Sequence, residues 1–192
     1  MQWMAAFCGQ RRTSASARSR LLPFVVAAAL CFPFMNTFLH AQDTSQGAID
    51  REKTRRIANI AEEFCSRLQM TAKIDAIIVD ENKYGVSVEP VANQENRYTL
   101  SFDRKLLESL TSDELSAAIA HETGHIWIFT HHPFLQTEEL ANEIAFRVVS
   151  RDMMKEVYSK LWIHLGITGN IEEVLGPDPQ TAAVRNAAVI HP

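Results

Sequence analysis

The feature that most constrains this chain is a pair of histidines, His121 and His125, in the pattern His-Glu-x-x-His. The residues before it predict a helix, because Thr111 is followed three positions later by Glu114, as in a capping box, and apolar residues then recur at helical spacing. We expect this helix to cover about residues 111–129. Side chains four positions apart lie on one face of a helix, so both imidazoles can reach a single metal ion.

Between the two histidines lies Glu122, which would stand beside such an ion without having to bind it. A carboxylate there can take a proton from a zinc-bound water and return it to a leaving amine. The pattern therefore predicts Zn²⁺ as the cofactor and a zinc metalloendopeptidase with Glu122 as its catalytic base. The alternative is a non-catalytic zincin-like binding module that keeps the metal site. Glu122 favours the enzyme, since a structural zinc site is closed by four protein ligands.

A catalytic zinc has three protein ligands, so a third ligand must be found. His131 has the spacing of a metzincin ligand, but Ile128 occupies the position where a glycine would let the chain turn back. The other candidates lie on the following helix. Glu138 is ranked first, and Glu143 is ranked second because it could reach inward if the two helices form a plain hairpin.

Residues 106–125, together with Glu138-Glu139-Leu140-Ala141-Asn142, resemble peptidase family M48, the group of HtpX and the CAAX prenyl proteases. The resemblance covers about residues 98–150. It implies a gluzincin-type site in which Glu138, from a Glu-x-x-Ala-Asp motif, is the third zinc ligand beside His121 and His125. Asn142 stands where that family usually has Asp, and its amide carbonyl can still accept a hydrogen bond from a ligating histidine. The ImmA/IrrE-type peptidases (family M78), which use Glu-x-x-Ala-Asn after a shorter gap, are the second family considered.

The remaining patterns predict an α+β fold. The expected architecture is a mostly helical zincin-like domain with a small antiparallel sheet preceding the His-Glu-x-x-His helix. Alternating or β-branched stretches predict strands at 73–80, 84–89 and 98–102, and helical spacing predicts helices at 48–70, 137–149 and 152–164. A peptide substrate in extended form could then lie along the strand at 98–102.

Residues 1–41 contain four arginines and no acidic residue, and an apolar run occupies positions 21–35. A basic segment without acidic residues, followed by an apolar run, is typical of a secretory signal peptide. We therefore expect a zincin-like metallopeptidase domain at 42–176, a poorly ordered tail at 177–192, and a periplasmic or secreted location. If the segment is not cleaved it would anchor the chain in a membrane, and it allows transient membrane association.

Charge and cysteine content narrow the partners. Four of the 19 Lys and Arg lie in residues 1–41, so 15 remain against 23 Asp and Glu, a net charge of −8. An acidic domain of this kind is a poor nucleic-acid binder, and the predicted partner is a peptide or protein substrate. Cys65 is the one cysteine after residue 41, which rules out an intramolecular disulfide there.

Overall fold

The computed structural model describes residues 36–178, with side chains from residue 45 onward. Of the predicted signal peptide (1–41) only residues 36–41 are described, and of the predicted tail (177–192) only residues 177 and 178; the rest of both segments lies outside the described residues. Helix α1 (Asn36–Arg67) crosses the boundary between two units of the chain, the first ending at Ile49 and the second beginning at Asp50. Within the described range, no helix combines the length and the apolar character needed to span a membrane. The elements described below all belong to the second unit.

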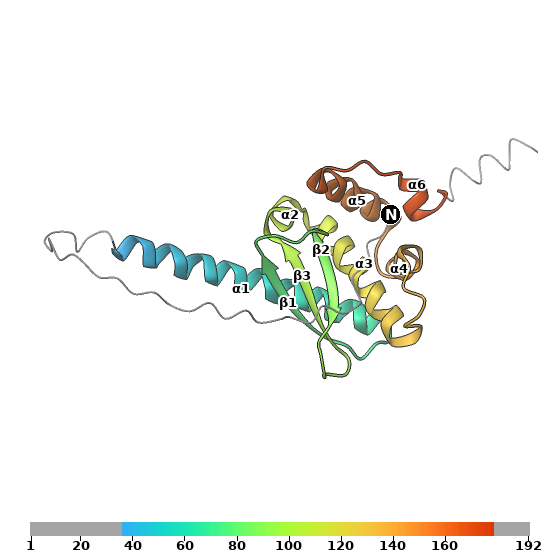
Figure 1. The fold of residues 1–192 in the computed structure, drawn as a ribbon, viewed down its shortest axis with the longest axis horizontal. Coiled ribbons are helices and arrows are strands. Elements are labelled where there is room, and N and C mark those ends of the chain that lie inside the picture. The colour runs from blue at the N-terminus through green and yellow to red at the C-terminus, as the bar shows by residue number, and fades with distance from the viewer. Residues whose placement is uncertain (1–35, 179–192) are drawn as a thin grey trace, which may run out of the picture. The chain divides into compact units, whose positions relative to one another are not determined.

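Three strands form one mixed sheet: β1 (Lys73–Val79), β2 (Val86–Pro90) and β3 (Arg97–Asp103). Their order in space is β1-β3-β2, so β3 lies in the middle (Figure 1). β2 pairs with β3 in antiparallel fashion, but β1 runs parallel to β3. The predicted antiparallel sheet is therefore wrong for this pair. Side-chain alternation identifies the buried face of each strand, but it contains no information about which strand becomes its neighbour.

One face of the sheet is packed. On β2 and β3 buried apolar side chains alternate with exposed or partly exposed ones, and the buried apolar set comprises Val86, Val88, Tyr98, Leu100 and Phe102. The strand register brings Val88 opposite Leu100 and Val86 opposite Phe102, which places all five on the same face. Such alternation is expected of a sheet covered on one side only.

The helices follow the sheet in sequence. They are α2 (Arg104–Ser109), α3 (Ser112–His131), α4 (Glu138–Ala145), α5 (Arg151–Leu165) and α6 (Ile171–Leu175). Helix α3 packs against β2, α4 and α5, and is thus the central element (Figure 1). The predicted mostly helical α+β fold, with a small sheet before the helix that bears the histidines, is confirmed. The short helix α6 is an addition to the predicted elements.

The start of α3 is fixed by the predicted capping box. The Thr111 hydroxyl accepts a hydrogen bond from the Glu114 amide at 3.3 Å, and the Glu114 carboxylate accepts one from the Thr111 amide at 2.7 Å. Helix α4 begins as predicted after Thr137, whose hydroxyl accepts from the Leu140 amide, but it ends at Ala145 instead of residue 149.

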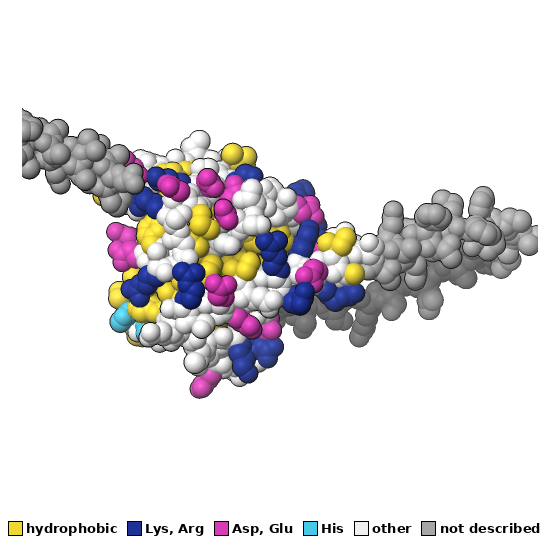
Figure 2. All heavy atoms as spheres, turned by 180° about the vertical axis from the view of Figure 1, so that it is seen from behind, with side chains coloured by type: hydrophobic (Ala, Val, Ile, Leu, Met, Phe, Trp, Pro, Cys, Tyr) yellow, Lys and Arg dark blue, Asp and Glu magenta, His cyan; other side chains and the backbone are white. Residues whose placement is uncertain are grey.

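On the face seen in Figure 2, acidic and basic side chains are interspersed around hydrophobic ones. Surface ion pairs of the second unit include Arg97 with Asp75 at 2.6 Å and Arg55 with Glu52 at 2.8 Å. Exposed pairs of this kind contribute at most about 1 kcal/mol each. The stability of the fold therefore rests on its buried core.

Candidate metal centre

A glycine allows α3 and α4 to approach closely. A Cβ atom built on Gly124 would lie 2.4 Å from the backbone carbonyl oxygen of Ala141, far inside ordinary contact. No side chain could occupy that space, so only glycine lets the two backbones lie this near. The close approach brings the first turn of α4 alongside the histidines of α3.

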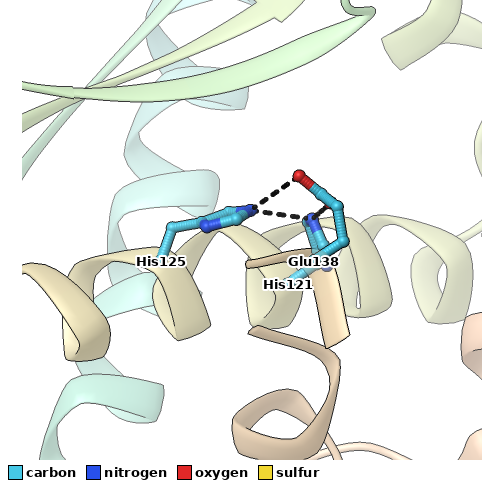
Figure 3. A group of neighbouring side chains, drawn as sticks. All are labelled: His121, His125 and Glu138. Carbon is cyan, nitrogen blue, oxygen red and sulfur yellow. Dashed lines mark hydrogen bonds and ion pairs between the residues drawn. The ribbon is translucent and has the colours of Figure 1, made fainter. Parts of the chain in front are cut away.

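His121 and His125 on α3 converge with Glu138 from the first turn of α4 (Figure 3). The two Nε2 atoms are 3.1 Å apart, and Glu138 Oε2 lies 3.2 Å from His121 Nε2. The distance from Glu138 Oε1 to His125 Nε2 is 3.8 Å. Ligands bound tetrahedrally to zinc at ~2.0–2.1 Å would stand about 3.3 Å from one another, so these spacings suit one such ion.

The hydrogen bonds of the two Nδ1 atoms indicate whether His121, His125 and Glu138 suit a cation. Nδ1 of His121 lies 2.8 Å from the Asn142 amide oxygen, and Nδ1 of His125 lies 3.3 Å from Gln136 Oε1. Amide oxygens only accept hydrogen bonds, so these contacts place the proton of each imidazole on Nδ1. The two Nε2 lone pairs then face each other at 3.1 Å. Their repulsion is relieved by a cation held between them, and the donor set therefore fits a metal ion.

The charge on Glu138 also suits a ligand. Burial alone would raise the pKa of this carboxyl. Without an ion, hydrogen bonds and charge from protonated imidazoles of His121 and His125 outweigh burial and lower the pKa well below its usual range, and a cation between the Nε2 atoms would act in the same direction. Glu138 is accordingly ionised and turned towards the imidazoles, as a carboxylate ligand must be.

Glu122 lies beside these groups and is only 3 % exposed. Burial raises the pKa of its carboxyl to about 7. The charge of Glu138 adds to this effect, while His125 and a hydrogen bond from the backbone amide of Val88 oppose it. Val88 belongs to β2, so Glu122 is held between α3 and the sheet. A carboxyl with a pKa near neutrality is suited to exchange protons with a substrate.

The alternative third ligands point elsewhere. Glu143 is exposed on α4. His131, at the end of α3, is also exposed, and its ring stacks on Trp127 with centroids 4.1 Å apart. Of the candidates considered from the sequence, the structure brings only Glu138 to the two histidines.

Two further residues support the site and were not selected from the sequence. The Tyr158 hydroxyl, on α5, donates a hydrogen bond to the Asn142 amide oxygen at 3.0 Å, and its ring lies edge-on to that of His121. Burial raises the pKa of Tyr158, which keeps its hydroxyl protonated as a donor. Gln136 lies in the loop before α4. Nothing in the sequence distinguishes either residue, because both reach the site only through the packing of α3, α4 and α5.

Two histidines on one helix and a glutamate from the next form a His₂Glu donor set consistent with a metal ion, and a second, buried glutamate lies beside them. The chain is a distant homologue of HtpX proteases, which confirms the predicted resemblance. It is 25% identical over 148 residues to a protein described as "Protease HtpX homolog" from Bacteroides fragilis strain YCH46, a match that covers 74% of this chain and 44% of the relative. The homologue from strain ATCC 25285 matches with the same identity and coverage.

This chain thus spans less than half the length of the curated relatives that it matches. No family model matches it. Among solved structures, the metallopeptidase zymogen abylysin of Pyrococcus abyssi superposes with a TM-score of 0.42 and 15% sequence identity. That superposition covers 59% of this chain and 99% of the other.

Proposed function

We propose that the chain is a zinc-dependent metallopeptidase in which His121, His125 and Glu138 hold the ion and Glu122 is the general base. The observation that carries the proposal is the convergence of two imidazole Nε2 atoms and a carboxylate, with both Nδ1 atoms already bonded to amide oxygens. Two nitrogens and one carboxylate oxygen, with a fourth position left for water or substrate, are the ligands of catalytic zinc. The homology to HtpX proteases supports peptide hydrolysis as the reaction.

When bound, zinc supplies a Lewis acid that polarises the scissile carbonyl and lowers the pKa of a coordinated water to about 7. The protein's own part is proton transfer and orientation. Glu122 accepts the proton of the attacking water and delivers it to the leaving amine. The hydrogen bond from the Val88 amide holds the Glu122 carboxylate in position, and Asn142 holds His121.

The substrate cannot lie where the sequence suggested. The strand at 98–102 is part of β3, which is paired on both sides and has no free edge for a peptide. In the described part of the chain, β2 pairs with β3 alone, and its Val88 amide already points to Glu122. We infer that an extended peptide adds to the open edge of β2, which would bring the scissile bond next to the base.

The test is Glu122→Gln, which preserves side-chain volume and removes the base. Zinc content should remain at one ion per chain, while cleavage of a quenched fluorescent peptide library should fall by about 100-fold or more. Glu139→Gln, an exposed substitution on α4, is the matched control and should cleave like the wild type. Undiminished hydrolysis by Glu122→Gln would refute the assignment of the base.

The charge asymmetry of residues 1–41 supports a further proposal, that the chain is exported and cleaved. The N-terminus of protein purified from its native host should then lie near Gln42. Recovery of intact Met1 in a membrane fraction would instead indicate a retained anchor.

A further inference from the structure

The side chain of Asn142 connects the candidate metal centre to the short helix α6. Asn142 is 1 % exposed on α4. Its amide oxygen accepts hydrogen bonds from His121 Nδ1 at 2.8 Å and from the Tyr158 hydroxyl at 3.0 Å. Its amide nitrogen donates to the backbone carbonyl of Val174, in α6, at 2.9 Å. Both ends of one buried amide are therefore bonded, one end to a candidate ligand and the other to α6.

The orientation of this amide decides which ring nitrogen of His121 carries the proton. With its oxygen towards His121, Asn142 holds a proton on Nδ1 and leaves the Nε2 lone pair free for a metal. With its nitrogen towards His121, it would donate to Nδ1 and favour the tautomer that has a proton on Nε2. The Val174 carbonyl can only accept a hydrogen bond, so it selects the first orientation. The Tyr158 hydroxyl favours the same orientation by donating to the oxygen.

We propose that α6 is a positioning element of the metal centre: the Val174 carbonyl, with Tyr158, fixes the Asn142 amide so that His121 presents a free Nε2. The inference rests on the proposed metal site. It adds to that site helix α6, which is separated from the helix of Glu138 by α5. It makes Val174 and Tyr158 positioning residues. Val174 acts on the ion only through Asn142 and His121, whereas Tyr158 acts through Asn142 and through its own contact with His121 Nδ1 at 3.4 Å.

The end of α6 is in turn held by α5. The Arg151 guanidinium donates to the carbonyl oxygen of Leu175 at 2.5 Å and also to that of Gly176. The Leu175 side chain is buried, which fixes the same turn from the other side. Arg151 has no bond to the histidines. It reaches them through α6, or through the Phe146 ring at the end of α4, whose centroid lies 5.7 Å from the guanidinium carbon.

The arrangement explains why an amide suits position 142 in this chain. A carboxylate could accept the bonds from His121 and Tyr158, but its second oxygen would face the Val174 carbonyl oxygen in a buried site. Two buried acceptors with no proton between them repel each other, and each loses its hydration without gaining a partner. An aspartate at position 142, which family M48 usually has there, is therefore expected to weaken the metal site of this chain.

The first experiment measures the zinc affinity of Asn142→Asp in the full chain by competition with a chromogenic chelator. Substitutions that disturb the partners of a metal-binding histidine weaken metal binding about ten- to hundredfold, and we expect a loss in this range. If α6 had no positioning role, the carboxylate would make His121 a more basic ligand, and zinc binding would be equal or tighter. Affinity at or above that of the wild type would overturn the proposal.

The second experiment needs no zinc. The tautomer of His121 is read from imidazole nitrogen shifts in ¹⁵N-histidine-labelled, metal-free protein. We expect the Nδ1–H form in the wild type and a larger Nε2–H fraction in Arg151→Ala, accompanied by zinc binding about two- to thirtyfold weaker. Lys160→Ala is the matched control, since Lys160 is also on α5 and also donates to a backbone carbonyl, that of Ser109, away from α6.

An Arg151→Ala protein with the tautomer ratio of Lys160→Ala would show that α6 does not orient His121. Tyr158→Phe provides an independent variant in case Arg151→Ala fails to fold, and it should shift the His121 tautomer in the same direction. An unchanged tautomer in Tyr158→Phe would equally count against the proposal. Failure of the metal site itself would be recognised separately, because His121→Ala would then bind as much zinc as the wild type.

Discussion

Replacement of Gly124 by alanine tests whether the close approach of α3 and α4 builds the candidate metal centre. The added Cβ would lie 2.4 Å from the Ala141 carbonyl oxygen, and ordinary contact begins at 3.4 Å. The two backbones must therefore separate by about 1 Å, because the obstacle is a carbonyl group and not the end of a flexible side chain. Glu138 and Asn142 are both on α4 and would move with it.

Two effects on stability oppose each other. Alanine in place of glycine inside a helix favours folding by about 0.5–1 kcal/mol. Overpacking of a closely packed interior costs about 1–3 kcal/mol. We expect a net loss of about 0.5–2 kcal/mol in the free energy of unfolding. We also expect zinc affinity to fall about tenfold or more, because Glu138 and the histidine partner Asn142 shift together.

The measurements are chemical denaturation in the presence of a chelator and zinc titration of the folded protein. Gly166→Ala is the control, because Gly166 has φ +65° with open space around it. Alanine is strained there by about 1 kcal/mol, but no contact between α3 and α4 changes. A Gly124→Ala protein that is more stable than the wild type and binds zinc equally well would refute the argument from backbone contact.

Three other outcomes are expected. Glu138→Gln should weaken zinc binding strongly in a chelator competition while Glu143→Gln binds like the wild type, since only Glu138 faces the histidines; equal losses would contradict this. Asp103 accepts backbone hydrogen bonds at the start of α2, which outweigh burial and lower its pKa. Asp103→Ala should therefore cost about 1–2 kcal/mol at pH 7. The difference should shrink as pH falls from about 4, where the unfolded chain begins to bind the proton, through the lower pKa of the folded wild-type carboxyl; a difference independent of pH in urea melts would argue against it. Burial raises the pKa of Cys65 to about 11, so iodoacetamide at pH 8 should label Cys65 in the denatured chain and spare it in the folded one, as peptide mass spectrometry would detect.

The sheet and the support of the metal centre were the least predictable parts. The strand segments were found within a few residues, but the parallel pairing of β1 with β3 was missed, because alternation reports burial and says nothing of neighbours. Helix α6 was missed because its five residues, which end at Leu175, carry too little periodicity to be recognised. Its contribution at Val174 comes from the backbone, which has no signature in the sequence.

The sequence by itself determined the parts of the site that are local. His121, Glu122 and His125 are brought together by one turn of helix, and the capping box that starts this helix spans only four positions, so both follow from helical geometry alone. For Glu138 the sequence could only rank candidates. Only tertiary structure could show which candidate lies beside the histidines, because the approach of α4 depends on a backbone contact at Gly124, and the orientation of Asn142 depends on α5 and α6. Those contacts join segments distant in the chain, and their geometry is set by the packing of the whole core.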